Sequence, residues 1–123
     1  MIKTILIVGL GGGAGSILRF LVQRIFQPHS TGVFPTGTFL VNIAGCFLIG
    51  LFWGWMSRYI EWIEEMKLLL MTGFCGGFTT FSAFTMESIG LLKENKTGLF
   101  FSYITGSVII GLVATYVGIR LTK

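Results

Sequence analysis

Long hydrophobic runs separated by short polar segments dominate the chain. Four runs, at about residues 4–26, 34–56, 66–92 and 98–121, are each long enough for a bilayer-crossing helix, which needs about 20 residues. The polar segments between them are short, and Ser57–Lys67 holds three of the five acidic residues. The pattern predicts an all-α membrane protein with a single four-helix transmembrane domain. Ser57–Lys67 is expected to form a short interfacial helix or turn.

The middle of the third run is unsuited to an unbroken helix. Gly76-Gly77 has maximal backbone freedom, and the hydroxyls of Thr79-Thr80 suit the start of a new helix. We therefore expect the third helix to be broken mid-membrane, at about residues 75–80. Such a break frees backbone carbonyls, which must be buried in protein or line a watery cavity or ion site. The alternative is that the glycines serve close helix packing.

The residues after this break combine aromatic rings with hydroxyl groups. Phe81 and Phe84 share one helix face because they are spaced i, i+3, and Ser82 and Thr85 lie close beside them. Glu87 adds an ionisable group one turn further on. The combination favours a permeation or binding site within the membrane, whereas phenylalanines alone would fit a lipid or core face.

Three further polar positions lie within the first two runs. Asn42 lies well inside the second, with Thr38 four residues earlier on the same helix face. The Asn42 amide either bonds a neighbouring helix or donates to an anion. Arg19 either snorkels to the interface or supplies positive potential to an anion vestibule.

Small and hydroxyl-bearing residues also pattern the first and last runs. In the first, the glycines between Gly9 and Gly15 form small-xxx-small pairs that let another helix approach closely. In the last, a stripe at i, i+4 steps predicts a face toward protein or water; it comprises Tyr103, Ser107, Gly111 and Thr115. The alternative is that these hydroxyls bond their own i−4 carbonyls.

Composition excludes several function classes. Hydrophobic residues make up 53% of the 123 positions and charged residues only 11%, against about a quarter in a typical globular protein. The net charge is +4, but no basic cluster is present to bind nucleic acid. The sequence shows neither a catalytic dyad nor a nucleotide-binding loop, so an enzyme is not expected. Cys46 and Cys75 lie in apolar runs, where free thiols are expected rather than a disulfide, and no Cys/His cluster indicates a metal.

The basic residues are distributed almost evenly between the two ends of four such helices. One end carries five (Lys3, Arg58, Lys67, Arg120, Lys123) and the other four if Arg19 snorkels (Arg19, Arg24, Lys93, Lys96). Five against four is hardly a positive-inside bias. Insertion in both orientations, and hence an antiparallel dual-topology homodimer, is therefore expected.

Three segments in order resemble the Fluc/CrcB fluoride channel family, and the likeness covers essentially the whole chain. Residues 11–20 (GGGAGSILRF) resemble its GGxxGAxxRY signature, residues 37–47 (GTFLVNIAGCF) its GTLxVNxxGSF, and residues 73–84 (GFCGGFTTFSAF) its GFCGGxTTFSTF. Four positions depart from these motifs: Ser16, Phe20, Cys46 and Ala83 replace Ala, Tyr, Ser and Thr. Gly111 leaves the stripe of the last helix without a hydroxyl, which puts the far end of a polar track in doubt.

The resemblance implies an inverted-topology homodimer in the cell (plasma or inner) membrane, with two pores that export fluoride passively and protect the cell from its toxicity. Phe81 and Phe84 would turn ring edges toward the ion, and Asn42 would donate to it. The remaining pathway residues would be Thr38, Thr80, Ser82, Tyr103 and Ser107, with Arg19 at the vestibule. Carbonyls of Gly76 and Thr79 would hold a structural Na⁺ at the dimer interface.

Two other functions are open to a small four-helix membrane protein. A proton-coupled dual-topology exporter needs an acid deep in the membrane, but Glu87 falls late in the third run. A non-transporting membrane assembly subunit would need only the glycines, and it leaves Asn42, the aromatic pair and the polar stripe without a role.

Overall fold

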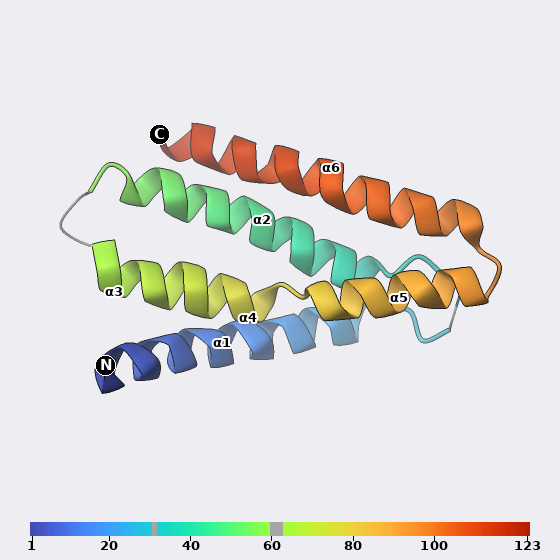
Figure 1. Cartoon of the computed structure of the whole chain (residues 1–123), viewed down its shortest axis with the longest axis horizontal. Helices are drawn as coiled ribbons and strands as arrows, with labels where there is room; N and C mark the ends of the chain where they lie inside the picture. The colour runs from blue at the N-terminus through green and yellow to red at the C-terminus, as the bar shows by residue number, and fades with distance from the viewer. Residues whose placement is uncertain (31, 60–62) are drawn as a thin grey trace.

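A computed structural model describes residues 1–30, 32–59 and 63–123, so Glu61 of the polar connection lies outside the described residues. The elements in order are α1 (Ile2–Phe26), α2 (Thr36–Met56), α3 (Ile63–Lys67), the π-helical segment η2 (Leu68–Cys75), α4 (Gly76–Phe78), α5 (Phe81–Lys93) and α6 (Thr97–Thr122). Four helical stretches are long and apolar enough to cross a membrane: 2–26, 36–56, 64–93 and 97–122. Both termini lie at the same end of the bundle (Figure 1). The predicted all-helical, four-span layout is confirmed.

The third stretch changes conformation twice along its length. It continues from α3 into η2, and it is interrupted between α4 and α5, where the backbone of Thr79 (φ −88°, ψ 157°) and Thr80 (φ −147°, ψ 116°) is extended. Gly76 and Gly77 are helical, so within the expected region 75–80 the interruption lies at the C-terminal side. The interruption is two residues wide.

Glycines bring α1 against η2 and α4. A β-carbon on Gly11 would lie 2.3 Å from the Leu69 carbonyl oxygen, and one on Gly15 would lie 2.1 Å from the Phe74 carbonyl oxygen. A β-carbon on Gly77 would meet the carbonyl oxygen of Gly12 at 2.4 Å. Gly77 is therefore used for close helix approach, as the packing alternative predicted.

A second glycine contact joins α2 to α6, the other helix pair that lies side by side in Figure 1. β-carbons on Gly50 and Gly118 would lie 2.2 Å and 2.5 Å from backbone oxygens of the facing helix. The hydroxyl of Thr115 in α6 also donates to the Cys46 carbonyl of α2 (3.0 Å). The bundle thus contains two close helix contacts, one between α1 and the η2–α4 part of the interrupted stretch and one between α2 and α6. The α5 part of the interrupted stretch packs on α6 and so links the two.

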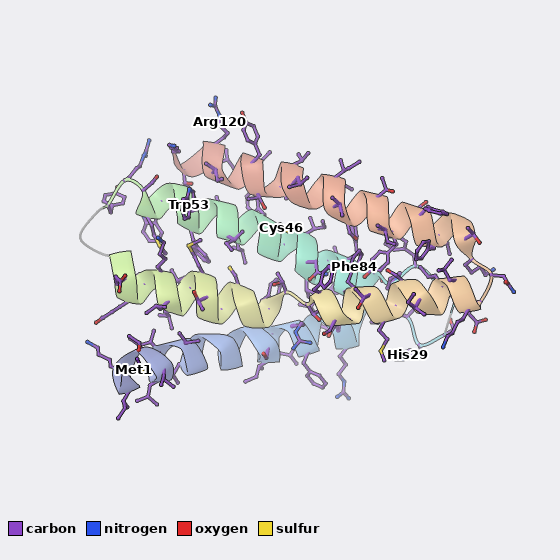
Figure 2. The ribbon with its side chains drawn as sticks, in the orientation of Figure 1. Met1, His29, Cys46, Trp53, Phe84 and Arg120 are labelled. Carbon is purple, nitrogen blue, oxygen red and sulfur yellow. The ribbon has the colours of Figure 1, made fainter. Side chains whose placement is uncertain are left out.

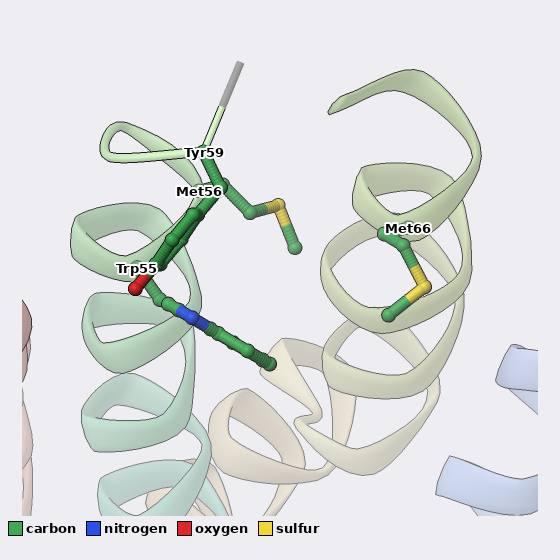
Figure 3. Close-up of a pocket in the computed structure, with 4 residues that line it drawn as sticks. All are labelled: Trp55, Met56, Tyr59 and Met66. Carbon is green, nitrogen blue, oxygen red and sulfur yellow. The ribbon is translucent and has the colours of Figure 1, made fainter. Parts of the chain in front are cut away.

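Aromatic and sulfur side chains gather where α2 ends and α3 begins. Trp55, Met56 and Tyr59 face Met66 across an apolar pocket of about 280 Å³ (Figure 3). Beside it, the Lys67 ammonium lies 5.1 Å from the centroid of a half-exposed Trp53 ring. Half-exposed tryptophans at this end are typical of a membrane–water interface.

Candidate functional site

Asn42 of α2 holds the interruption in place. Its Oδ1 accepts from the backbone N–H of Thr80 (2.8 Å), and its Nδ2 donates to the Thr80 carbonyl (3.0 Å). In a continuous helix the Thr80 N–H would bond the carbonyl of Gly76, four residues earlier. The Asn42 Oδ1 therefore replaces the helical partner of the Thr80 N–H, whereas the Thr80 carbonyl, which as the N-cap carbonyl of α5 accepts the first bond of that helix, gains a second donor. This is the helix-bonding alternative for Asn42, and its second Nδ2 hydrogen is left over.

The two ends at the interruption are capped. The Thr80 hydroxyl accepts from the N–H of Ala83 (3.1 Å) and lies 3.3 Å from the Ser82 hydroxyl, so Thr80 is the predicted cap of a new helix. At the other end, the Arg19 Nε donates to the Gly77 carbonyl (3.0 Å). The Arg19 guanidinium thus has a partner inside the bundle, at the C-terminal end of α4, where a positive charge is favourable.

Aromatic rings lead from the surface at the interruption toward the interior. Phe81 is 76% exposed, and its ring centroid lies 5.8 Å from that of Phe84, near the start of α5 (Figure 2). The Phe84 ring in turn makes an edge contact with Tyr103 (4.9 Å, 62°), which is fully buried. Phe81, Phe84 and Tyr103 thus form one row of rings. The row begins at the surface of the chain and ends at the buried hydroxyl of Tyr103.

The buried end of this row is a cluster of hydrogen bonds on Glu87. Tyr103 donates to one carboxylate oxygen (3.1 Å), and the hydroxyl of Thr38 (2.8 Å) and the amide of Gln27 donate to the other. Thr38 also donates its backbone N–H to Gln27 Oε1 (2.9 Å) and accepts from Gln23 Nε2 (3.0 Å). Three donors on one carboxylate join α2, α5, α6 and Gln27, the residue that follows α1, at this point.

Sequence reasoning missed Gln23 and Gln27. The signal that could have found them is their spacing: Arg19, Gln23 and Gln27 follow at i, i+4 steps and so share one face of α1. All three make hydrogen bonds toward the site.

The polar stripe of α6 faces protein, as its pattern predicts. Tyr103 reaches Glu87 and Thr115 reaches Cys46, so for these two residues the alternative of self-bonded hydroxyls is wrong. The Ser107 hydroxyl oxygen, one turn from Tyr103, is buried without a hydrogen-bond partner among the described residues. Gly111 continues the stripe against the Cys46 thiol.

Hollows lie at both ends of this arrangement. One, of about 330 Å³, is lined by Asn42, Gly76, Thr79, Thr80 and Phe81 among others. The other, of about 440 Å³, is lined by polar and basic side chains beside Glu87: Gln23, Arg24, Gln27 and His29. Among the described residues no group of three His, Cys, Asp or Glu side chains could hold a metal, so any cation here would need other ligands.

Comparison with known proteins places the chain in a family. The family model described as CrcB-like protein, Camphor Resistance (CrcB), matches residues 6–119. A protein of Flavobacterium psychrophilum named fluoride-specific ion channel FluC is 46% identical over 121 residues, which cover 98% of each chain. Proteins of the same name from Phocaeicola vulgatus and Gloeothece citriformis are also 46% identical, over 98% and 97% of this chain. The chain therefore belongs to the CrcB-like family, and its four long apolar helices make it a multi-pass membrane protein.

Proposed function

We propose that the protein is an ion channel that lets fluoride leave the cell passively, and that it is not an enzyme. The observation that carries the proposal is the row Phe81–Phe84–Tyr103, which joins the hollow at the interruption to the hydrogen-bond cluster beside the second hollow. The names of the relatives, fluoride-specific ion channels, support the same conclusion.

The chemistry of these groups suits a small, strongly hydrated anion. A pore for such an ion must replace its water with hydrogen-bond donors, and neutral donors do so without trapping it. The Ser107 hydroxyl and the second Nδ2 hydrogen of Asn42 are neutral donors, and the hydroxyls of Tyr103 and Thr38 would join them when they turn from Glu87 to the ion. Aromatic rings add weak attraction at their positive edges. Several weak sites in series permit entry and exit, which conduction requires.

The proposed assembly is an antiparallel homodimer inserted in both orientations. Five basic residues at one end face four at the other, or three if Arg19, which binds the Gly77 carbonyl, is not counted, so the bias is small either way. Phe81 is 76% exposed in the single chain, and a second copy would cover it and close the hollow beside it. Labelling of a cysteine added at the C-terminus should detect it on both sides of the membrane; labelling from one side alone would refute dual topology.

A structural sodium ion is part of the proposal, and the interruption fits it. The N–H groups that would reach the Gly76 and Thr79 carbonyls in a continuous helix belong to Thr80 and Ala83, which donate to Asn42 and to the Thr80 hydroxyl instead. Gly76 and Thr79 also line the open hollow. Carbonyl oxygens suit a hard cation, and Na⁺ would supply positive charge that favours an anion nearby.

The coupled-exporter alternative is less well supported. It requires an acid that is free to exchange protons for a substrate, whereas Glu87 accepts from Gln27, Thr38 and Tyr103 at once. An assembly subunit needs only the glycine contacts and gives no reason for a Ser107 hydroxyl that is buried and has no partner in the described part of the chain.

Liposome efflux tests the proposal. Vesicles loaded with potassium fluoride and carrying a potassium ionophore should release fluoride through the wild-type protein without a proton gradient, and release chloride far more slowly. Equal chloride efflux, or a requirement for protons, would refute the channel. Replacing external and internal Na⁺ by N-methylglucamine should lower the flux if the cation is structural; unchanged flux would remove sodium.

Two substitutions test the ring row itself. Phe84→Ile should slow fluoride efflux by about 2- to 10-fold, since an aromatic contact is worth about 0.5–1.5 kcal/mol beyond its buried area. Phe101→Ile is the matched control, because this ring is 61% exposed on α6 and contacts Phe100 outside the row. Equal effects of the two substitutions would show that the row has no special part in conduction.

A further inference from the structure

Three sulfur-bearing side chains line the hollow at the interruption. They are Cys46 of α2 and Met71 and Cys75 of η2, and both cysteines are free thiols. Cys46 lies midway along α2, labelled in Figure 2. Neither the hydrogen-bond cluster on Glu87 nor the proposed carbonyl site of Gly76 and Thr79 uses any of these sulfurs.

The two cysteine-bearing segments are held close together. Gly45, the neighbour of Cys46, is in such tight contact with Thr79 that a β-carbon there would lie 2.1 Å from its Cγ2. The Thr79 hydroxyl in turn donates to the carbonyl of Cys75 (2.9 Å).

Space is also available around the Cys46 thiol. Its sulfur lies 3.3 Å from the position that a β-carbon on Gly111 would occupy, so the absence of a side chain at Gly111 leaves the thiol room beside α6. The hollow itself, about 330 Å³, is larger than the roughly 30 Å³ that one water molecule occupies in the liquid. A single metal ion therefore fits without displacing a helix.

We propose that Cys46, Cys75 and Met71 form a binding site for one soft d¹⁰ metal cation of the silver or cuprous type. Thiolate and thioether sulfurs select soft monovalent metals, whereas the carbonyl oxygens of Gly76 and Thr79 in the same hollow suit a hard cation. On binding, the two thiols each form a sulfur–metal bond and release one proton to solvent, while the thioether of Met71 binds without releasing one.

The consequence for transport depends on the function proposed above. The metal would lie in the hollow that also contains Gly76, Thr79 and Phe81, at the entrance of the ring row. Silver is therefore expected to slow fluoride efflux. Binding itself does not depend on the channel function, so the two are measured separately.

The test uses Ag⁺ as the probe on the purified full chain in detergent. Equilibrium dialysis should give about one Ag⁺ per chain, pH-stat titration should show up to two protons released, and X-ray absorption should report sulfur ligands. Cys46→Ser should lower the affinity by at least about 100-fold, because losing even an outer-shell partner of a metal ligand costs about 10- to 100-fold. Serine is the residue that the related channel motif has at this position, so this variant is expected to fold.

Met86→Leu is the matched control, since Met86 is 77% exposed on α5 outside the hollow and its loss should leave silver binding unchanged. Met71→Leu should weaken binding less than Cys46→Ser. Silver binding that persists in Cys46→Ser, or oxygen ligation in the absorption spectrum, would overturn the site. If the wild-type protein binds silver through sulfur but shows no fluoride efflux in the absence of silver, the proposed function fails and the metal site stands.

Discussion

Asn42 offers the sharpest test of how the interruption is held. Both of its amide groups bond Thr80, at 2.8 and 3.0 Å; removing them leaves the Thr80 N–H without a partner, whereas the Thr80 carbonyl keeps the first bond of α5. An unpaired buried N–H costs about 1–3 kcal/mol. The hollow beside Asn42 decides where in this range a substitution falls, because water that enters it can replace the lost bonds.

Two replacements separate these limits. Asn42→Ala enlarges the hollow, admits water, and should lower the free energy of unfolding by about 1 kcal/mol, the lower end of this range. Asn42→Leu fills the same volume with hydrocarbon, excludes water, and should cost about 3 kcal/mol, the upper end of this range. The measurement is reversible SDS unfolding in mixed micelles, followed by circular dichroism, with fluoride efflux recorded on the same preparations.

Thr115→Val sets the scale for one ordinary bond, because it removes a single hydroxyl that donates to the Cys46 carbonyl and keeps the shape of the side chain. It should cost about 1 kcal/mol. If Asn42→Leu is no more destabilising than Thr115→Val, or if Asn42→Ala is the worse of the two, then Asn42 does not hold the interruption in the way its geometry implies.

Three other results are expected. Gly15→Ala should destabilise the protein by about 1–3 kcal/mol by overpacking, whereas Gly13→Ala, which meets nothing within 4 Å, should not; equal effects in unfolding experiments would contradict the packing of α1. Tyr103→Phe removes one hydroxyl bond to a carboxylate and should lower stability by about 1 kcal/mol and slow fluoride efflux, and normal efflux would exclude that hydroxyl from the pathway. Breaking the exposed ion pair of Lys3 and Glu65 by Lys3→Met should leave unfolding unchanged, and a clear loss would show that this pair is not screened by solvent.

The four helical stretches could be predicted because their signal is local: each is a run of apolar residues long enough to cross a bilayer. The cap at Thr80 was predictable for the same reason. Its hydroxyl accepts from the N–H of Ala83 only three residues later, so the signal lies within one short segment. The position of the interruption was not. A glycine pair favours a break and close packing equally. Gly77 packs against Gly12, which lies 65 residues earlier in the chain, so no local pattern shows which of the two occurs.

The site was predicted in its members more than in their contacts. Hydrophobic and polar patterning selected Asn42, Phe84 and Tyr103, but which atoms they bond depends on how four helices meet. Glu87 stood out as an ionisable residue in an apolar run, yet its three donors come from three other helices. The glutamines of α1 passed unnoticed because neutral polar residues near the end of a membrane helix are common.

Because Thr79 and Thr80 are extended, the rotation of α5 about its axis is not fixed by that of α4. In a continuous helix each residue turns by about 100°, so the face presented by Phe81, Phe84 and Glu87 would be dictated by the packing of η2 and α4 on α1. With two extended residues between α4 and α5, the direction of that face is set instead by the hydrogen bonds of Asn42 to Thr80 and by the contact of α5 with α6. The glycine contacts of α1 can therefore drift during evolution, or be repacked by design, without rotating the aromatic row away from Tyr103.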